Sequence, residues 1–240
     1  MNILVTGASG GVGKAIVQQL IGGDRVMFLH YYQPSAKLLL SKLVNDQPHT
    51  HLLSADLTKE KDLIALLSHL KKKGGVEIII HTVTAPTKLD DVLTKKPLDF
   101  QRHFDLQVKS LLIMTRQLVP GMIKKRFGRI IAIASDYVVG KPPAKLADYV
   151  TAKYALLGLV KSLAVELGEL GITANCISPG LMETELTAHL PQALKKIVAA
   201  QTPTRRLTTP AEVAQLVAFL CSPHSAQITG QNLLINGGYA

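Results

Sequence analysis

Asn2-Ile-Leu-Val-Thr-Gly-Ala-Ser-Gly-Gly-Val-Gly-Lys-Ala-Ile-Val17 opens the chain with an apolar run, a glycine-rich turn and the start of a helical pattern. A short run that is apolar throughout is typical of a strand covered on both faces, as in a parallel sheet. Glycines in a strand-to-helix turn let an anion approach backbone N–H groups, and the helix N-terminus adds a favourable dipole. The segment therefore predicts a strand at Ile3–Thr6, a pyrophosphate-binding turn, and a helix from Gly13.

Outward from this turn, strand-like and helix-like segments alternate along the chain. Further strands are expected at Arg25–His30, His51–Ala55, Glu77–Thr82, Arg129–Ala134, Thr173–Ile177 and Asn232–Ile235. Helices are expected at Gly13–Ile21, Ser35–Asn45, Lys59–Leu70, Leu98–Lys124, Asp148–Leu170 and Pro210–Leu220. This alternation predicts an α/β fold, a doubly wound Rossmann-type parallel sheet of about seven strands with helices on both faces.

The chain is expected to form a single domain over residues 1–240. The last of these helices carries a start signal, since Thr209, Pro210 and Glu212 match a capping box with proline at the first helical position. The segment Pro179–Arg206 breaks the rhythm and predicts a helical lid, at about residues 181–206, over the carboxyl ends of the strands.

Composition excludes several classes of protein. With 47% hydrophobic and 18% charged residues the chain is not disordered, and no apolar run approaches the ~20 residues of a spanning helix. The first residues do not resemble a signal peptide, and two cysteines, Cys176 and Cys221, form neither a disulfide framework nor a metal-ligand pattern. These features predict a cytoplasmic protein.

The net charge of +10, from 27 basic and 17 acidic residues, indicates either a well-solvated basic surface or a partner that carries phosphates or carboxylates. Nucleic acid is the weaker candidate. Tryptophan is absent, aromatic residues are 5%, and the basic clusters are scattered without interleaved stacking side chains.

Tyr149-Val-Thr-Ala-Lys153 places a phenol and an ammonium one helical turn apart. A phenol with a pKa of ~10 is a poor acid–base catalyst, and a neighbouring ammonium is expected to lower that pKa. Ser135 ends the apolar run that begins at Gly128, and carboxyl ends of strands are where doubly wound sheets build their sites. Ser135 is therefore expected to hydrogen-bond a substrate carbonyl beside Tyr149.

Taken in order, these motifs resemble the short-chain dehydrogenase/reductase family over essentially the whole length, and most closely its 3-oxoacyl-acyl-carrier-protein reductases. The residues that carry the resemblance are Thr6-Gly-x-x-x-Gly-x-Gly13, Asp56, Gly128-Arg-Ile, Ser135, Tyr149-x-x-x-Lys153, Asn175, Pro179-Gly180 with Thr184, and Ile228-Thr-Gly-Gln231 with Gly237-Gly238.

The resemblance implies hydride transfer between a nicotinamide dinucleotide and a carbonyl. Tyr149 would donate the proton, Ser135 would polarise the carbonyl, and Lys153 would hold the nicotinamide ribose and lower the tyrosine pKa. The implied cofactor-binding residues are Thr6, Gly7, Ser9, Gly11, Val12, Gly13, His30, Tyr31, Asp56, Leu57, Tyr149, Lys153, Pro179, Gly180 and Thr184.

Two departures from the family pattern stand out. His81-Thr-Val-Thr84 replaces the family's Asn-Asn-Ala-Gly, so the backbone is expected to shift beside the cofactor's adenosine ribose. His81 itself is interpreted as a hydrogen-bonded histidine at the end of a strand. Gln107 stands where the family has a catalytic asparagine. That asparagine lies where the long helix opens and holds a proton-carrying water, and Gln107 is expected to keep this role.

The choice of cofactor depends on the end of the second strand, because an acidic residue there would accept the ribose hydroxyls of NAD. That position falls on His30 or Tyr31, and neither is acidic. His30, Gln33, Ser35 and Lys37 offer donors instead, so NADP(H) is favoured over NAD(H). Gly10 stands where many NADP-dependent members of the family carry arginine, and the lack of arginine there argues against NADP(H).

The basic surface fits an acidic acyl carrier protein or a coenzyme A thioester, and the family resemblance implies that a 3-oxoacyl thioester is the favoured substrate. Arg126 matches one of the family's docking cations, whereas the second position falls on Leu170. The alternatives are reduction of a small free ketone, quinone or sugar-derived carbonyl, or a dinucleotide-binding sensor or assembly partner without turnover. By family analogy, the long helices predict a homotetramer.

Overall fold

The computed structural model describes residues 1–45 and 47–239; Asp46 and Ala240, which the expected domain includes, lie outside the described residues. Its centre is a seven-stranded sheet of order β3-β2-β1-β4-β5-β6-β7 in which every neighbouring pair is parallel. The strands are β1 (Asn2–Thr6), β2 (Val26–Tyr31), β3 (Thr50–Ser54), β4 (Ile78–His81), β5 (Gly128–Ile133), β6 (Ile172–Pro179) and β7 (Asn232–Ile235). All seven expected strands are present.

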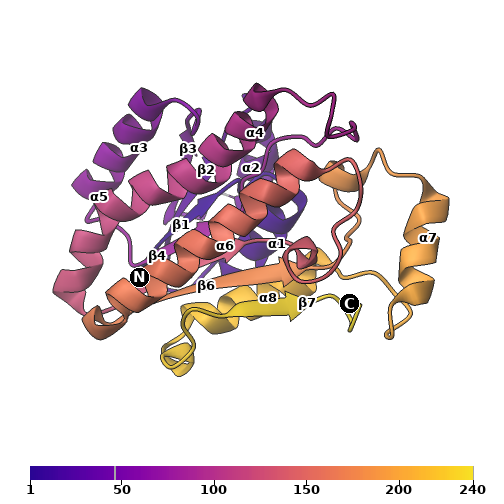
Figure 1. Ribbon diagram of the computed structural model, residues 1–240. Coiled ribbons are helices and arrows are strands. Elements are labelled where there is room, and N and C mark those ends of the chain that lie inside the picture. Colours follow the sequence, from indigo (N-terminus) through magenta and orange to yellow (C-terminus); the bar gives the residue numbers. More distant parts are fainter. Residues whose placement is uncertain (46, 240) are drawn as a thin grey trace.

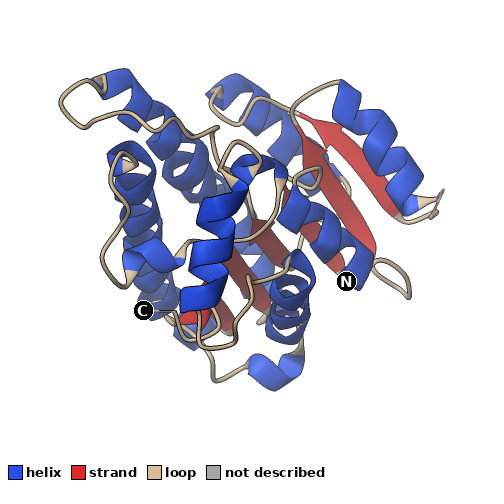
Figure 2. Ribbon diagram, turned by 90° about the vertical axis from the view of Figure 1, so that its right-hand side faces the viewer, coloured by secondary structure: helices blue, strands red, loops and turns tan. Residues whose placement is uncertain are grey.

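Helices cover both faces of this sheet (Figures 1 and 2). They are α1 (Gly11–Leu20), α2 (Ser35–Val44), α3 (Glu60–Lys72), α4 (Pro97–Phe104), α5 (Ser110–Lys125), α6 (Ala147–Leu167), α7 (Gln192–Gln201) and α8 (Pro210–Cys221). Helices α3, α5 and α6 pack on one face, and α1, α2 and α8 pack on the other. The predicted doubly wound α/β fold is confirmed.

The alternation of side chains along each strand supplies the two cores. In β1, Leu4 packs among the residues of α3, α5 and α6, whereas Ile3 and Val5 pack among those of α1, α2 and α8. All three side chains are fully buried. Because neighbouring residues of a strand point to opposite faces, a central strand covered on both sides has to be apolar at every position.

The long helix expected at Leu98–Lys124 is divided. Residues Asp105–Lys109 form a π-helical segment between α4 and α5, so the helix opens at the position of Gln107. A π-helical turn of this kind often occurs at a functional site. Within the 181–206 segment the structure forms the helix α7, which stands apart from the helices that cover the sheet (Figure 1).

The order of the strands places a cleft at their carboxyl ends. The chain leaves β1 towards β2 on one side and returns to β4 on the other, so the loops after β1 and β4 separate above the sheet. The capping box predicted at Thr209 and Glu212 is confirmed, with the Thr209 N–H donating to the Glu212 carboxylate at 2.8 Å. None of the helices among residues 1–45 and 47–239 is long and apolar enough to cross a membrane.

Candidate active site

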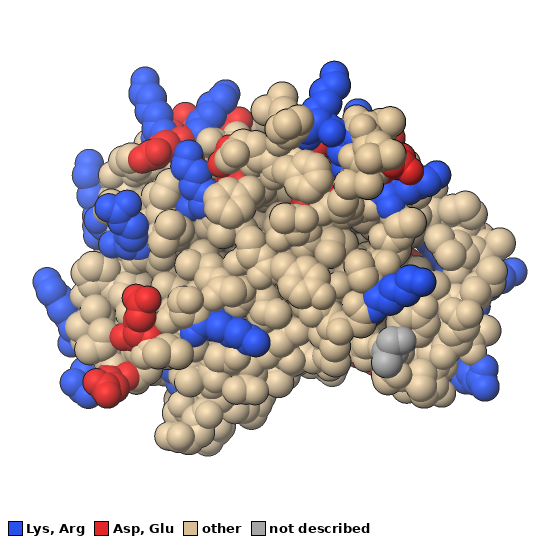
Figure 3. All heavy atoms as spheres, in the orientation of Figure 1, with Lys and Arg blue, Asp and Glu red and all other residues tan. Residues whose placement is uncertain are grey.

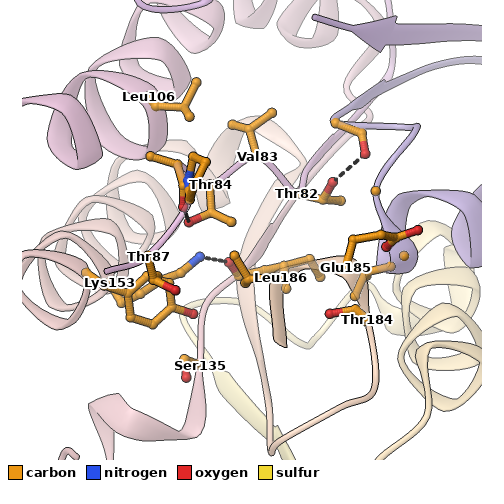
Figure 4. Close-up of a pocket in the computed structure, with 18 of the residues that line it drawn as sticks. Thr82, Val83, Thr84, Thr87, Leu106, Ser135, Lys153, Thr184, Glu185 and Leu186 are labelled. Carbon is orange, nitrogen blue, oxygen red and sulfur yellow. Dashed lines mark hydrogen bonds between the residues drawn. The ribbon is translucent and has the colours of Figure 1, made fainter. Parts of the chain in front are cut away.

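A cavity of about 910 Å³ lies at the carboxyl ends of the strands. Its walls come from the glycine-rich turn, the loop after β4, the ends of β5 and β6, the helix α6 and the segment after β6. Figure 4 shows Ser135 and Lys153 on one side of this cavity, Thr82–Thr84 on a second side, and Thr184–Leu186 on a third. Fourteen of the predicted site residues line it, namely Gly7, Ser9, Gly11, Val12, Gly13, His30, Asp56, Leu57, Ser135, Tyr149, Lys153, Pro179, Gly180 and Thr184.

The glycine-rich turn has no room for side chains at two positions. Gly7 has a φ of +70°, and a Cβ added there would lie 2.7 Å from Thr82 Oγ1. A Cβ on Gly13 would lie 2.2 Å from the Gly7 carbonyl oxygen. Gly13 thus lets α1 start directly against the turn, with its first N–H groups facing the cavity, and this geometry suits a pyrophosphate.

Ser135, Tyr149 and Lys153 meet at the inner end of the cavity. Ser135 follows β5, whereas Tyr149 and Lys153 lie one turn apart on α6, and all three are buried. The Lys153 ammonium donates to the Ile133 carbonyl oxygen at 2.6 Å and lies 5.5 Å from the centre of the Tyr149 ring. The serine, phenol and ammonium that the sequence predicted are therefore brought to one wall of the cavity.

Burial governs the ionisation of this group. It raises the pKa of Tyr149 above its ordinary value, an effect that Ser135 partly opposes, and it lowers the pKa of Lys153 to about 7. The expectation that Lys153 lowers the Tyr149 pKa is therefore wrong for this structure. Desolvation is the largest cause of both shifts, and it favours the neutral form of both side chains.

The end of β2 differs from the expectation. His30 accepts a hydrogen bond from the Gly7 N–H at 3.2 Å through Nδ1, and its Nε2 lies 3.0 Å from the Ala55 carbonyl oxygen. Burial lowers the pKa of His30. Its ring therefore joins the glycine-rich turn to the end of β3 as a neutral group, and it has no donor left for a cofactor phosphate.

Tyr31 does not line the cavity. It is 7% exposed and packs among the residues of α1, α2 and α8, because side chains alternate along β2. Tyr32 and Gln33, which follow the strand, line the cavity in its place. The cavity-lining position after Tyr31 comes one residue later than expected because β2 ends at Tyr31 instead of His30.

Thr6 and Gln107 also lie outside the cavity. The Thr6 hydroxyl lies 2.9 Å from His81 Nδ1, and His81 Nε2 lies 3.0 Å from the Gln107 carbonyl oxygen. Burial, with a further contribution from Lys153, lowers the pKa of His81 to about 3. The imidazole is therefore neutral and, as expected, has hydrogen-bond partners at both nitrogens.

The Gln107 side chain is buried and points to His103. Its Nε2 lies 3.1 Å from His103 Nδ1, and its buried Oε1 has no partner among the described residues. The carbonyl oxygen of Gln107 faces His81. The Gln107 Nε2 and carbonyl oxygen thus contact the two histidines, and the proton-relay role of Gln107 stays a prediction.

Asp56 ends the third strand region beside Leu57, as expected. Burial alone would raise the pKa of Asp56, but two hydrogen bonds from Thr58, at 3.1 Å from N and 2.6 Å from Oγ1, together with Lys59, lower it. The carboxylate is therefore held in its ionised form at the edge of the cavity. At this position it accepts hydrogen bonds but does not donate them.

The segment after β6 folds over the glycine-rich turn. A Cβ on Gly11 would lie 2.8 Å from the Thr184 methyl carbon, so this segment and the first turn of α1 are in close contact. The Glu185 carboxylate accepts a hydrogen bond from Lys14. This places a protein anion beside the α1 N-terminus.

Sequence reasoning missed the apolar part of the cavity. Its leucines come from the loop after β4, from the α4 and π-helical region, from the start of α6 and from the segment after β6, and they are Leu89, Leu98, Leu106, Leu146, Leu186 and Leu190. They lie too far apart in the sequence to form a motif. Beside the polar group at Ser135, they can hold an apolar substrate with its carbonyl at the serine and tyrosine.

Three comparisons place this geometry among known proteins. A family model described as enoyl-(acyl carrier protein) reductase matches residues 7–240. The 3-oxoacyl-acyl-carrier-protein reductase of Vibrio cholerae is 34% identical over 239 residues, covering 98% of this chain and 95% of the relative. Nodulation protein G of a Rhizobium species is 33% identical over 238 residues, covering 99% and 96%.

Among solved structures, the 3-ketoacyl-(acyl-carrier-protein) reductase of Brucella melitensis complexed with NADH is similar with a TM-score of 0.89. It is 27% identical and covers 99% of this chain and 97% of its own. The fold is thus shared with a protein whose structure was solved in complex with NADH.

Proposed function

This chain belongs to the short-chain dehydrogenase/reductase family and is an NAD(P)-dependent oxidoreductase, and from that premise we propose that it reduces the keto group of a 3-oxoacyl thioester. The observation that carries the proposal is the joint position of Ser135, Tyr149 and Lys153 in one cavity with an apolar wall. Relatives at 33–34% identity are named 3-oxoacyl-acyl-carrier-protein reductases, which supports the thioester over other carbonyls.

In the proposed mechanism the bound dinucleotide supplies a hydride to the carbonyl carbon. Ser135 donates a hydrogen bond to the carbonyl oxygen, and Tyr149 transfers its phenolic proton to that oxygen as negative charge develops there. The raised pKa of Tyr149 keeps the phenol protonated before this transfer. Lys153 stabilises the phenolate that remains, in the fraction of molecules that carry the ammonium.

The residues of the cofactor side fit a dinucleotide. The absence of side chains at Gly7, Gly11 and Gly13 leaves the N-terminus of α1 accessible to a pyrophosphate, and we assign Asp56 and Leu57 to the adenine. Pro179, Gly180 and Thr184 would contact the nicotinamide carboxamide. We assign the ribose to Tyr149 and Lys153, as the family resemblance implies.

We propose that the protein prefers NADP(H), which carries a phosphate on the 2′ position of its adenosine ribose, over NAD(H). The residues that follow β2 into the cavity, Tyr32 and Gln33, carry no acid that would repel a 2′-phosphate. Neither His30 nor Tyr31 contributes to this preference, since the first has partners at both ring nitrogens and the second lies in the core.

An acidic carrier protein is the proposed partner. Lys124, Lys125 and Arg126 end α5, and Arg126 is exposed. Figure 3 shows lysine and arginine side chains gathered over the α3, α4 and α5 side of the molecule. Positive charge of this kind attracts an acidic partner and raises its rate of association.

We further propose a single domain with residues 181–206 as its substrate lid, assembled as a homotetramer. The outer faces of α5 and α6 carry exposed apolar side chains at Leu112, Tyr154 and Val165, the last 83% exposed. Figure 3 shows few charged atoms on the face that contains α6. Apolar surface with little charge is typical of an interface between subunits.

The decisive experiment measures NADPH oxidation with acetoacetyl-carrier protein, acetoacetyl-coenzyme A and a panel of free ketones. We expect the carrier-linked substrate to have the highest kcat/KM, and Tyr149→Phe to lower kcat at least 100-fold with a nearly unchanged dissociation constant for NADPH, because Lys153 remains to hold the ribose. Arg126→Glu should raise KM for the carrier-linked substrate alone, and the exposed Lys72 on α3 supplies the control, Lys72→Glu. A higher kcat/KM for a free ketone would contradict the thioester, and turnover of none would favour a binding protein.

A further inference from the structure

Lys95, in the loop before α4, and Asp148, in the first turn of α6, form a buried ion pair. Lys95 Nζ lies 2.8 Å from Asp148 Oδ2, and the two side chains are 1% and 5% exposed. Removing two charges from water costs more free energy in the interior than at the surface. The attraction between the charges offsets this cost only if further hydrogen bonds satisfy the remaining polar atoms. Both residues have such bonds: Lys95 bonds to the loop before α4, and Asp148 bonds to the backbone of Tyr149.

Lys95 stabilises the loop between β4 and α4, residues 82–96. Its ammonium also donates to the Lys88 carbonyl oxygen at 3.0 Å, which joins the two ends of the outer part of this loop. Residues 82–87 and Leu89 of the same loop line the cavity. Lys95 thus fixes a cavity wall and, through Asp148, attaches that wall to α6.

Asp148 connects the pair to the tyrosine. It directly precedes Tyr149, and its Oδ1 accepts a hydrogen bond from the Tyr149 N–H at 2.9 Å. Its Oδ2 lies 3.8 Å from His103 Nε2. The His103 ring meets the Tyr149 ring edge-on with 5.9 Å between centroids, and Tyr137 packs on Tyr149 in the same manner at 6.4 Å.

His103 is itself held in one orientation. Gln107 Nε2 donates to His103 Nδ1 at 3.1 Å, which assigns the imidazole proton to Nε2, on the side of Asp148. Burial lowers the pKa of His103, although Asp148 opposes this, so the ring remains neutral. The buried Gln107 side chain, which does not line the cavity, thereby contributes to the wall against which the Tyr149 ring packs.

We propose that Lys95 is a positioning residue which, through Asp148 and His103, holds the substrate loop 82–96 and the Tyr149 phenol in one fixed relation. The inference rests on the proposed function in one respect, that Tyr149 is the proton donor. A single ammonium then sets both the cavity wall on the substrate side and the orientation of the acid. A displacement of about 1 Å between them is enough to slow proton transfer by up to about 100-fold.

The glycine-rich turn is anchored at a distance along the chain from Lys95. Thr82, at the β4 end of the loop, and His30 contact Thr6, Gly7 and Ala55, whereas Lys95 contacts Lys88 and Asp148. Disturbing the ion pair should therefore change turnover without changing dinucleotide affinity. A general loss of folding would change both.

The test compares Lys95→Met with Lys96→Met, which removes the neighbouring exposed ammonium from the same loop. A third variant, Lys95→Met with Asp148→Asn, removes both charges and keeps an oxygen for the Tyr149 N–H. Each protein is measured for kcat, for the dissociation constant of NADPH, for the midpoint of thermal unfolding, and for amide hydrogen exchange of residues 85–95.

We expect Lys95→Met to lower kcat at least tenfold with the NADPH dissociation constant within twofold of wild type, and to increase exchange of residues 85–95. Lys96→Met should remain within twofold in kcat. The double variant should recover the unfolding midpoint, because no unpaired charge is buried, yet keep the low kcat and the fast exchange.

Recovery of kcat to within twofold of wild type in the double variant would overturn the proposal, because burial of an unpaired carboxylate would then explain the single variant. Equal kcat values for Lys95→Met and Lys96→Met would also overturn it. If Lys95→Met does not fold, the double variant decides by the same criteria. A fully active Tyr149→Phe would contradict the proposed function instead, and the exchange comparison would still show whether Lys95 holds the loop.

Discussion

The Glu185 carboxylate, in the segment that follows β6, accepts a hydrogen bond from Lys14 in the first turns of α1. The hydrogen bond from Lys14 is the main cause that lowers the pKa of Glu185, and the Gly11 backbone contributes to the same effect. A protein anion therefore lies beside the N–H groups proposed for the dinucleotide pyrophosphate. We therefore expect Glu185 and a bound pyrophosphate to compete for the positive end of α1.

Replacing Glu185 should therefore tighten cofactor binding. We expect Glu185→Gln to lower the NADPH dissociation constant about threefold to fivefold, the equivalent of about 1 kcal/mol, because a negative charge is removed and Lys14 is released. Fluorescence titration at two salt concentrations measures this, with the difference shrinking at high salt. Glu183→Gln is the matched control in the same segment, and weaker binding by the Glu185 variant would contradict the competition.

The rate of carbonyl reduction should depend on the protonation of Lys153. Burial lowers its pKa to about 7, so the ammonium that stabilises the Tyr149 phenolate is lost as the pH rises through that value. We expect kcat/KM for reduction to fall above pH 7, by up to about tenfold per pH unit. Initial rates between pH 6 and 9 test this, with Lys161→Met on the exposed face of α6 as a control. A profile that rises between pH 7 and 9 would exclude the lysine as the group that titrates.

Asp136, next to Ser135, should make stability dependent on pH. Burial raises its pKa from 3.8 to about 6, so the folded protein binds a proton that the unfolded chain has released over that interval. Stability conferred by the protonated carboxyl is therefore lost as the pH rises from about 4 to 6. Asp136→Asn should stabilise the protein by about 1 kcal/mol at pH 8 and should have no effect at pH 4. The expected gain is smaller than the full pKa shift implies because the carboxyl is partly solvated. Equal gains at both pH values would argue against titration of this carboxyl.

The preference for NADP(H) can be tested where β2 ends. Tyr32 is 56% exposed and lines the cavity, so Tyr32→Asp places a carboxylate where it would repel a 2′-phosphate. We expect the ratio of kcat/KM for NADPH to that for NADH to fall at least tenfold. Tyr31→Asp, one residue earlier, should lower the unfolding midpoint instead, because it buries a charge in the core. A wild-type protein that prefers NADH would refute the preference itself.

The strand pattern, the glycine spacing and the Ser135, Tyr149 and Lys153 positions could be predicted because each depends on local features of the chain. Each of three features is encoded within about 10 residues: a continuous apolar run, a strand-to-helix turn that excludes side chains, and two residues one helical turn apart. The capping box at Thr209 and Glu212 belongs to the same class. Strand and helix boundaries were correct to within a few residues for the same reason.

Tertiary structure alone decided how these groups are surrounded. Packing decides that the Tyr31 side chain points into the core. It also brings together the side chains of Gln107 and His103, and those of Lys95 and Asp148. The ionisation of Tyr149 and Lys153 was misjudged for a related reason. The attraction between neighbours can be read from their spacing, but the desolvation that shifts both pKa values depends on every side chain that excludes water from the site.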